Sequence, residues 1–298
     1  MTNTSISIPP IATAAKGKQI QYMDTIDAYD RWAETHKTHS FLIPSPPETH
    51  KGIKARRKVY DTDGNFLQAL DTLEMQSLLP RFHSLLETNK NGNNDDVGPK
   101  LIDLGCGTGR NTVPLTRTAR ATAMIVGLEP SSKMLQTARD RVSKFLGTKS
   151  TESFASTAVE ATEEQGAGGG GVLSAAIGNA GGVISTLVME HVPLDQFFGA
   201  AAGMLKRGGV LLVTNMHSEM GSISQAGFVD PNTGVKIRPT SYTHTVEEMV
   251  EAAEKVGFEV LGDIKEVRID EDLAGKLGKR ARKWIGVLVW YGGNFRKK

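Results

Sequence analysis

From about residue 100 onward, short apolar runs alternate with segments in which apolar residues recur every three or four positions. Runs of the first kind predict buried strands, and the periodic segments predict helices. Strands are expected at 101–104, 123–129, 183–188, 210–215, 258–261 and 285–290, and helices at 110–120, 131–145, 194–205 and 246–256. Continuously apolar strands separated by helices indicate an α/β fold, with a mainly parallel sheet covered by helices on both faces.

The pattern before residue 100 differs, because it contains helical segments and no strand-like run. We expect a polar tail over 1–20, a helix over 21–33, a loop-like insertion over 35–58 and a helix over 66–79 that Pro80 either ends or extends. Residues 21–97 then form an N-terminal helical cap, and 98–298 form the main domain. Within the latter, 147–182 fits poorly: its glycine run at 166–171 predicts a flexible insertion, with a strand possible at 153–159.

A second departure from simple alternation lies between the histidines at 217 and 244. The turn sequence at 230–234 separates two short extended segments, which predicts a β-hairpin arm over the substrate pocket. Phe228, Arg238 and Tyr242 are its candidate contacts with substrate. A simple surface hairpin and a contact in a homodimer remain the alternatives for this segment.

Composition narrows the class of protein. The 298 residues carry a net charge of +2 and show no basic stripe beyond 51–58, so nucleic acid is not an expected partner. A single cysteine excludes an internal disulfide framework and a cysteine-cluster metal site. No apolar run reaches the roughly 18 residues that span a bilayer, and no signal peptide is evident. We therefore expect a cytoplasmic protein without membrane contact.

The strongest chemical signal is the glycine motif from Asp103 to Arg110, DLGCGTGR, which follows a strand and opens a helix. Its glycines, Gly105, Gly107 and Gly109, would let a ligand approach backbone N–H groups at a helix start. Nicotinamide-binding proteins instead space their glycines as G-x-G-x-x-G, so this spacing opposes the alternative of an NAD-dependent oxidoreductase.

A carboxylate completes this signal. Glu129 ends the next strand, 20 residues after Gly109, where it can accept hydrogen bonds from the two ribose hydroxyls of an adenosine. The plain alternative is a glycine-rich turn followed by a surface acid. The order of strand, acid, three glycines, helix, strand and acid favours adenosine binding.

At these residues the chain resembles the class I S-adenosylmethionine (SAM)-dependent methyltransferases, in particular the ubiquinone/menaquinone C-methyltransferase-like group of fungal type. The resemblance covers about 100–290, with its motifs at 101–109, 126–135, 184–193 and 205–213 and further matches at 28–33 and 59–65. In such proteins the last two elements are nearly contiguous, whereas here the insertion 35–58 separates them. The resemblance implies a Rossmann-like seven-stranded sheet with a reversed last hairpin and SAM as cofactor.

The resemblance also implies roles for individual residues. Asp103 would support the glycine loop or the methionine ammonium, Glu129 would hold the ribose, and Leu187 would offer its backbone to the methionine moiety. Met134 would pack on the adenine or belong to the core, and Cys106 is expected to pack rather than to act as a nucleophile. The full expected cofactor set is Tyr29, Asp103, Gly105, Cys106, Gly107, Gly109, Glu129, Pro130, Met134 and Leu187.

Three residues are the candidates for catalysis. His217 follows the fifth strand at the edge where α/β proteins bind ligands, and it is the expected base or substrate-orienting group. Tyr29 and Tyr60 would form an aromatic lid over the sulfonium, or else pack the cap onto the core. His191, within the fourth-strand motif, is expected to be structural, and no metal site is expected.

These observations predict methyl transfer by in-line displacement to a small molecule such as a secondary metabolite. The region after the fourth strand lacks an Asn-Pro-Pro-Tyr-type element, which weakens nucleobase methylation. A SAM-binding regulator of the same fold without turnover remains the rival hypothesis. The acceptor atom cannot be read from the sequence.

Overall fold

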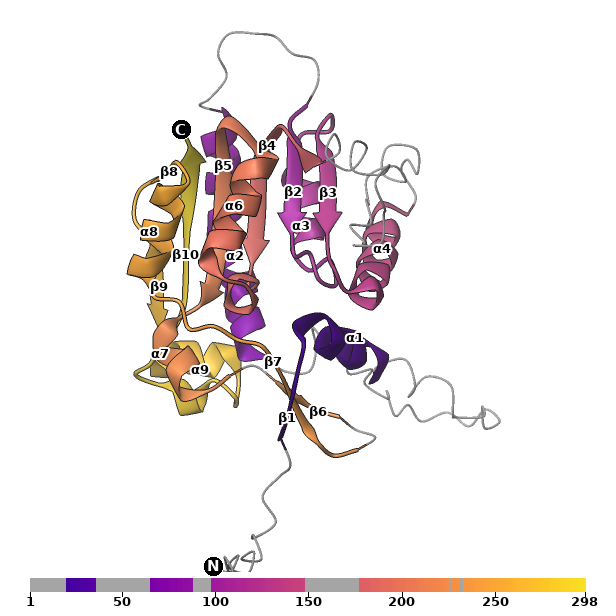
Figure 1. The fold of residues 1–298 in the computed structure, drawn as a ribbon, viewed down its shortest axis with the longest axis vertical. Helices are drawn as coiled ribbons and strands as arrows, with labels where there is room; N and C mark the ends of the chain where they lie inside the picture. The colour runs from indigo at the N-terminus through magenta and orange to yellow at the C-terminus, as the bar shows by residue number, and fades with distance from the viewer. Residues whose placement is uncertain (1–19, 36–64, 88–97, 148–176, 226, 231–232) are drawn as a thin grey trace, which may run out of the picture.

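The computed structural model describes residues 20–35, 65–87, 98–147, 177–225, 227–230 and 233–298. Its centre is a seven-stranded sheet in the order β3-β2-β4-β5-β10-β8, with β9 paired to β10 (Figure 1). β2, β3, β4 and β5 run parallel, whereas β10 is antiparallel to β5, β8 and β9. This confirms the predicted α/β fold with a reversed last hairpin. The strands are β2 (Lys100–Leu104), β3 (Met124–Leu128), β4 (Ala180–Thr186), β5 (Leu205–Met216), β8 (Phe258–Val260), β9 (Lys265–Arg268) and β10 (Leu288–Lys297).

The alternation of side chains along β5 builds two separate cores. Val210 and Leu212 face one cluster, which includes residues of α2 (Phe66–Glu87), α3 (Thr112–Thr118) and α9 (Glu271–Leu277). Leu211 and Val213 face the other, which includes residues of α6 (Leu194–Met204) and α8 (Val246–Lys255). All four β5 side chains are buried, as strands covered on both faces require. Figure 1 shows α6 and α8 in front of the sheet and α2 and α3 behind it.

α2 is longer than predicted, and its apolar residues pack in the same core cluster as residues of the sheet. It continues for two turns beyond Pro80, which lies on its exposed side. Leu70, Leu79 and Phe82 are buried against the sheet. The burial of this apolar face stabilises the helix by more than the loss of the backbone hydrogen bond that proline removes inside a helix.

The expected helix at 21–33 is wrong at its start. Ile20–Met23 form the strand β1, which pairs in parallel with β7 (Lys236–Pro239), and the helix α1 covers Thr25–Thr35. The side chain of Asp24 accepts a hydrogen bond from the amide of Ile26 and so ends the strand and begins the helix. A sequence of four residues without strand-like alternation could not reveal a partner more than 200 positions away.

The predicted hairpin exists and is part of a three-stranded sheet, β1-β7-β6, with β6 at Phe228–Val229. Phe228 and Ile237 pack against Ala28 of α1, so this small sheet carries α1. Figure 1 shows α1 and the small sheet together beyond the carboxyl ends of β2 and β3. The remaining helices of the described residues are α4 (Ser132–Leu146), α7 (Ser218–Ile223) and the short 3₁₀ helices η3 (Met189–His191) and η4 (Arg282–Trp284).

Several predictions shift or fall outside the described residues. The last strand begins at Leu288 and not at 285, and β5 begins at Leu205, where a helix end was expected. Most of the tail 1–20, the insertion 35–58, the strand considered at 153–159 and the glycine run lie outside the described residues. Among the helices that the structure does describe, none has both the length and the apolarity to cross a membrane.

Candidate functional site

The glycine motif forms a tight loop between β2 and α3. Gly105, Gly107 and Gly109 have φ values of +71°, +54° and +78°, a backbone region that other residues adopt at a cost. The amides of Gly105 and Cys106 donate to the carbonyl of Leu128 at 2.8 and 2.9 Å, which ties the loop to the end of β3. The three glycines are therefore required by the backbone itself.

Only one of these glycines faces open space. A Cβ at Gly105 would lie 2.4 Å from the side chain of Val188, and one at Gly109 would lie 3.2 Å from Ala138 of α4. A Cβ at Gly107 would meet nothing within 4 Å, and Gly107 lines a cavity. The close approach of a ligand is thus possible at Gly107, whereas Gly109 serves the packing of α4 against the loop.

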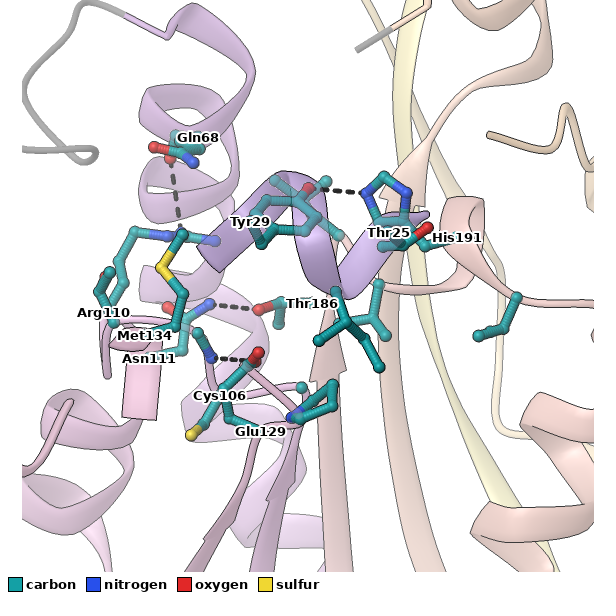
Figure 2. A pocket seen from close by; sticks show the side chains of 18 of the residues that line it. Thr25, Tyr29, Gln68, Cys106, Arg110, Asn111, Glu129, Met134, Thr186 and His191 are labelled. Carbon is teal, nitrogen blue, oxygen red and sulfur yellow. Dashed lines mark hydrogen bonds between the residues drawn. The ribbon is translucent and has the colours of Figure 1, made fainter. Parts of the chain in front are cut away.

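Glu129 lies beside Gly107, as the sequence predicts. Its Oε2 accepts a hydrogen bond from the Gly107 amide at 3.0 Å (Figure 2). Its Oε1 accepts one from the Ser131 amide at 2.9 Å. Burial raises the pKa of this carboxyl to about 7, although both amides counter the effect. A carboxylate offers about four lone-pair sites, so two remain for the hydroxyls of a ligand.

The start of α4 completes this side of the site. Ser131 is the N-cap, and its side chain accepts a hydrogen bond from the Met134 amide. Pro130 and Met134 line the cavity, and Met134 is also fully buried in the core. Cys106 lines the cavity as well, but burial raises the pKa of its thiol far above the usual range, which opposes a nucleophilic role.

Asp103 lies beneath the loop and does not line the cavity. Its Oδ2 accepts from the Thr112 hydroxyl at 2.6 Å, while its buried Oδ1 has no partner within the described residues. Burial raises its pKa to about 6. The hydroxyl that it accepts from belongs to the first residue of α3, and both roles considered for Asp103 stay predictions.

Leu187 follows β4 in a left-handed conformation, with φ +55°, which is rare for a non-glycine residue. Its amide donates to the carbonyl of Thr214 at 2.9 Å, and the residue lines the cavity. Strained backbone of this kind is typical of ligand sites. Leu187 therefore lies at the cavity, and its expected contact with a methionine moiety stays a prediction.

The cavity lies at the carboxyl ends of β2, β3 and β4 and measures about 450 Å³, within the range of small-ligand sites. α1 covers one side of it, and the segment after β7 covers another through Thr240 and Tyr242. Of the three arm residues considered as contacts, Tyr242 lines the cavity. Phe228 instead packs on α1, and Arg238 lies within 3.5 Å of the Tyr22 hydroxyl.

Tyr29 and His191 both line this cavity and contact each other there. The sequence predicts a structural role for His191 and does not predict its place in the cavity. The Tyr29 hydroxyl lies 2.8 Å from Nε2 of His191 (Figure 2). Nδ1 of His191 lies 3.0 Å from the Thr240 carbonyl oxygen. A carbonyl only accepts, so Nδ1 carries the hydrogen, and in the neutral ring Nε2 accepts the tyrosine proton. α1, η3 and the hairpin arm together hold this pair.

His217 is not brought to the cavity. Its Nδ1 accepts from the Glu219 amide, which caps α7, and its Nε2 lies 2.7 Å from a carboxylate oxygen of Glu266. The expected position at the end of β5 is correct, but both ring nitrogens are engaged away from the cavity. Tyr60, the third catalytic candidate, lies outside the described residues.

A buried polar network at the inner end of the cavity was also not predicted from the sequence. Asp71 of α2 is fully buried and contacts the guanidinium of Arg110, the amide of Asn111, the hydroxyl of Thr214 and the indole of Trp290. In the sequence, nothing distinguishes Asp71 from the other polar residues of this helix. Its partners come from three separate segments, so no local pattern could identify them.

The residues at Gly107 and Glu129 fit an adenosyl ligand on two observations. Gly107 leaves space for a close approach, and Glu129 retains two acceptor sites at the position expected for a ribose. Among the described residues, no group of three or more histidine, cysteine or acidic side chains could hold a metal ion.

Comparison with known proteins agrees with this geometry. Residues 102–213 match the family model described as a methyltransferase domain. An uncharacterised methyltransferase of Emericella nidulans is 44% identical over 93% of this chain and 92% of its own length. A ubiquinone biosynthesis O-methyltransferase of a Bradyrhizobium strain is 25% identical over 61% of this chain and 66% of its own.

Solved structures are more distant. A putative sarcosine dimethylglycine methyltransferase from Galdieria sulphuraria has a TM-score of 0.49 and 15% identity, over 78% of this chain and 86% of its own. Magnesium protoporphyrin IX methyltransferase from Synechocystis, solved with bound S-adenosylhomocysteine, has a TM-score of 0.48 and 14% identity, over 91% and 94% of the two chains. The match to the family model and the 44% identity with the Emericella protein over 93% of this chain show that the chain belongs to the class I SAM-dependent methyltransferases.

Proposed function

We propose that the chain transfers the methyl group of SAM to a hydroxyl of a small molecule, with His191 as the proton acceptor and Tyr29 as its partner. The observation that carries this proposal is the hydrogen-bonded pair of Tyr29 and His191 in the same cavity as Gly107 and Glu129. The cavity volume of about 450 Å³ supports a small acceptor.

SAM supplies a methyl group that is already activated on a sulfonium sulfur, and in-line displacement leaves a neutral thioether. The protein then has to align the reactants, exclude water and accept one proton. Gly107, Glu129 and Leu187 would hold the cofactor, and α1 with the hairpin arm would shield it from water. Tyr29 would also offer its ring to the sulfonium.

His191 is arranged to take the proton of the acceptor. The Thr240 carbonyl fixes the hydrogen on Nδ1, so Nε2 has its lone pair directed at Tyr29 within the cavity. As the acceptor oxygen forms its bond to carbon, its O–H bond breaks and the proton passes to Nε2, directly or through the Tyr29 hydroxyl. His191 would therefore favour acceptors that do not ionise readily in water.

The test combines substrate discovery with variants. The protein is incubated with isotopically labelled methyl donor and a small-molecule extract, and labelled products are identified by mass spectrometry. With the acceptor in hand, His191→Gln should lower kcat by about 10²- to 10⁴-fold. Tyr29→Phe should lower it less, and both should retain affinity for S-adenosylhomocysteine.

The control is His83→Gln, because His83 lies outside the cavity and contacts the Thr118 hydroxyl. The pH profile separates chemistry from folding, since the residual rate of His191→Gln should keep rising as the acceptor ionises on its own. An unchanged kcat for His191→Gln would exclude it as the proton acceptor. Binding of S-adenosylhomocysteine without labelling of any extract component would favour the rival hypothesis of a silent SAM-binding protein.

A further inference from the structure

The inner end of the cavity holds a cation of fixed charge. Arg110 is the single lysine or arginine among the described residues that line the cavity. Its Nη1 lies 2.7 Å from Oδ2 of Asp71 and 3.1 Å from the Thr72 hydroxyl, and its side chain remains 18% exposed. A guanidinium has five N–H donors, so this side chain can offer further donors to a ligand.

An acceptor without a partner lies next to this cation. Gln68 of α2 lines the cavity and is only 6% exposed, yet its Oε1 is buried and has no hydrogen-bond partner within the described part of the chain. Its backbone carbonyl accepts from Arg110, as Figure 2 shows, so the two residues are neighbours. A buried amide oxygen without a donor is unfavourable, and a ligand with an N–H group would relieve that cost.

We propose that Gln68 and Arg110 bind the amino acid end of SAM, whose position in this cavity rests on the proposed function. Oε1 of Gln68 accepts from the α-ammonium group, and the remaining N–H groups of Arg110 donate to the α-carboxylate. A cation beside an unpaired acceptor complements the opposite charges of a zwitterion. Glu129 and Gly107 then bind the nucleoside, and these two residues bind the other end.

Asp71 is the positioning residue of this receptor. It does not line the cavity, but its Oδ2 contacts Arg110 and the amide of Asn111, and Asn111 in turn donates to Thr186 at 2.7 Å. Its Oδ1 accepts from the Trp290 indole at 3.0 Å and from Thr214. With this carboxylate fixed by groups of β5 and β10, the guanidinium of Arg110 is held in one place.

The decisive experiment compares two ligands that differ in the amino acid end. S-adenosylhomocysteine has it, whereas 5′-methylthioadenosine lacks it and keeps the nucleoside. Calorimetry of Arg110→Met should show an affinity for S-adenosylhomocysteine that is about 10- to 100-fold lower, because charge-assisted hydrogen bonds are lost. Affinity for 5′-methylthioadenosine should stay within about twofold. Gln68→Leu should show the same selective loss, smaller in size.

Two further variants separate positioning from folding. Asp71→Asn should reduce the preference for S-adenosylhomocysteine, because Arg110 loses its anionic partner. Arg120→Met, on the surface beside Glu87, is the control for loss of an arginine. If Asp71→Asn does not fold, the Arg110 and Gln68 variants still decide.

An equal loss of affinity for both ligands in Arg110→Met would overturn the inference, because Arg110 would then stabilise the fold and would not bind the amino acid end of the ligand. Unchanged affinity for both, with a raised KM for the acceptor, would also overturn it by assigning Arg110 to the acceptor. Binding of neither ligand by the wild-type protein would instead refute the placement of SAM in this cavity, and this receptor with it.

Discussion

Replacement of Gly107 by alanine tests the site at its narrowest point. The structure gives two separate costs for this change, one to folding and one to binding. Gly107 has φ +54°, where an L-residue is less stable by about 1–2 kcal/mol. An added Cβ would meet nothing within 4 Å in the free protein, so no clash adds to the folding cost. The midpoint of thermal unfolding should fall by a few degrees, at about 2–4 °C per kcal/mol.

Binding should suffer more than folding. The methyl group that Gly107→Ala adds would occupy the space through which a ligand approaches the loop, and insertion of a methyl into a packed contact costs about 1–3 kcal/mol. The affinity for S-adenosylhomocysteine, measured by calorimetry, should therefore fall by roughly 5- to 150-fold. The heat of binding and the stoichiometry come from the same titration.

Gly257→Ala is the matched control for Gly107→Ala. Gly257 has φ +88°, a Cβ there would also meet nothing within 4 Å, and it follows α8 outside the cavity. This variant should lose comparable stability and keep wild-type affinity. If Gly107→Ala folds and binds S-adenosylhomocysteine as tightly as the wild type, no ligand approaches this loop and the site has been placed wrongly.

Three further predictions concern other parts of the molecule. His217→Ala should lose the cap of α7 and about 1 kcal/mol of stability, while turnover and KM stay at wild-type values; reduced turnover of the folded variant would restore His217 to the mechanism. Pro80→Ala should raise the midpoint of thermal unfolding, because Pro80 lies exposed inside α2 and alanine is more favourable than proline in a helix interior. An unchanged midpoint would contradict a cost of Pro80 to the stability of α2. Burial raises the pKa of Glu129 to about 7 and of Asp103 to about 6, so the native state binds these protons more tightly than the unfolded chain. The free energy of unfolding should therefore fall as pH rises from 5 to 8, and Glu129→Gln should flatten that slope in denaturant titrations.

The parts of the fold that could be predicted are those coded by contiguous residues. The core strands β2 and β3 and the glycine motif each depend on neighbours within a few positions, and they occur at or within one residue of where the sequence indicated them. The proximity of Glu129 to Gly107 was also predictable, because parallel neighbouring strands end at the same edge of a sheet.

The parts that could not be predicted depend on pairings across the chain. Tyr29 and His191 are 162 residues apart, and Asp71 and Trp290 are 219 apart. His217 shows the limit differently: its place after β5 was correct, but the direction of its ring depends on the Glu219 amide and on Glu266, which no local pattern reveals.

The buried acids at this edge of the sheet differ in whether a cation is bonded to them. Asp71 is a buried carboxylate with four hydrogen-bond partners, one of them the cation Arg110. Asp103 and Glu129 have no cation bonded to them in the described residues, and burial raises the pKa of both. A ligand that brings positive charge to this end of the cavity would favour their ionised forms. SAM carries a sulfonium and an ammonium, whereas S-adenosylhomocysteine carries the ammonium alone. With SAM bound as proposed, the product would bring one positive charge fewer to the cavity than the substrate does, and it would therefore favour the ionised forms of these acids less.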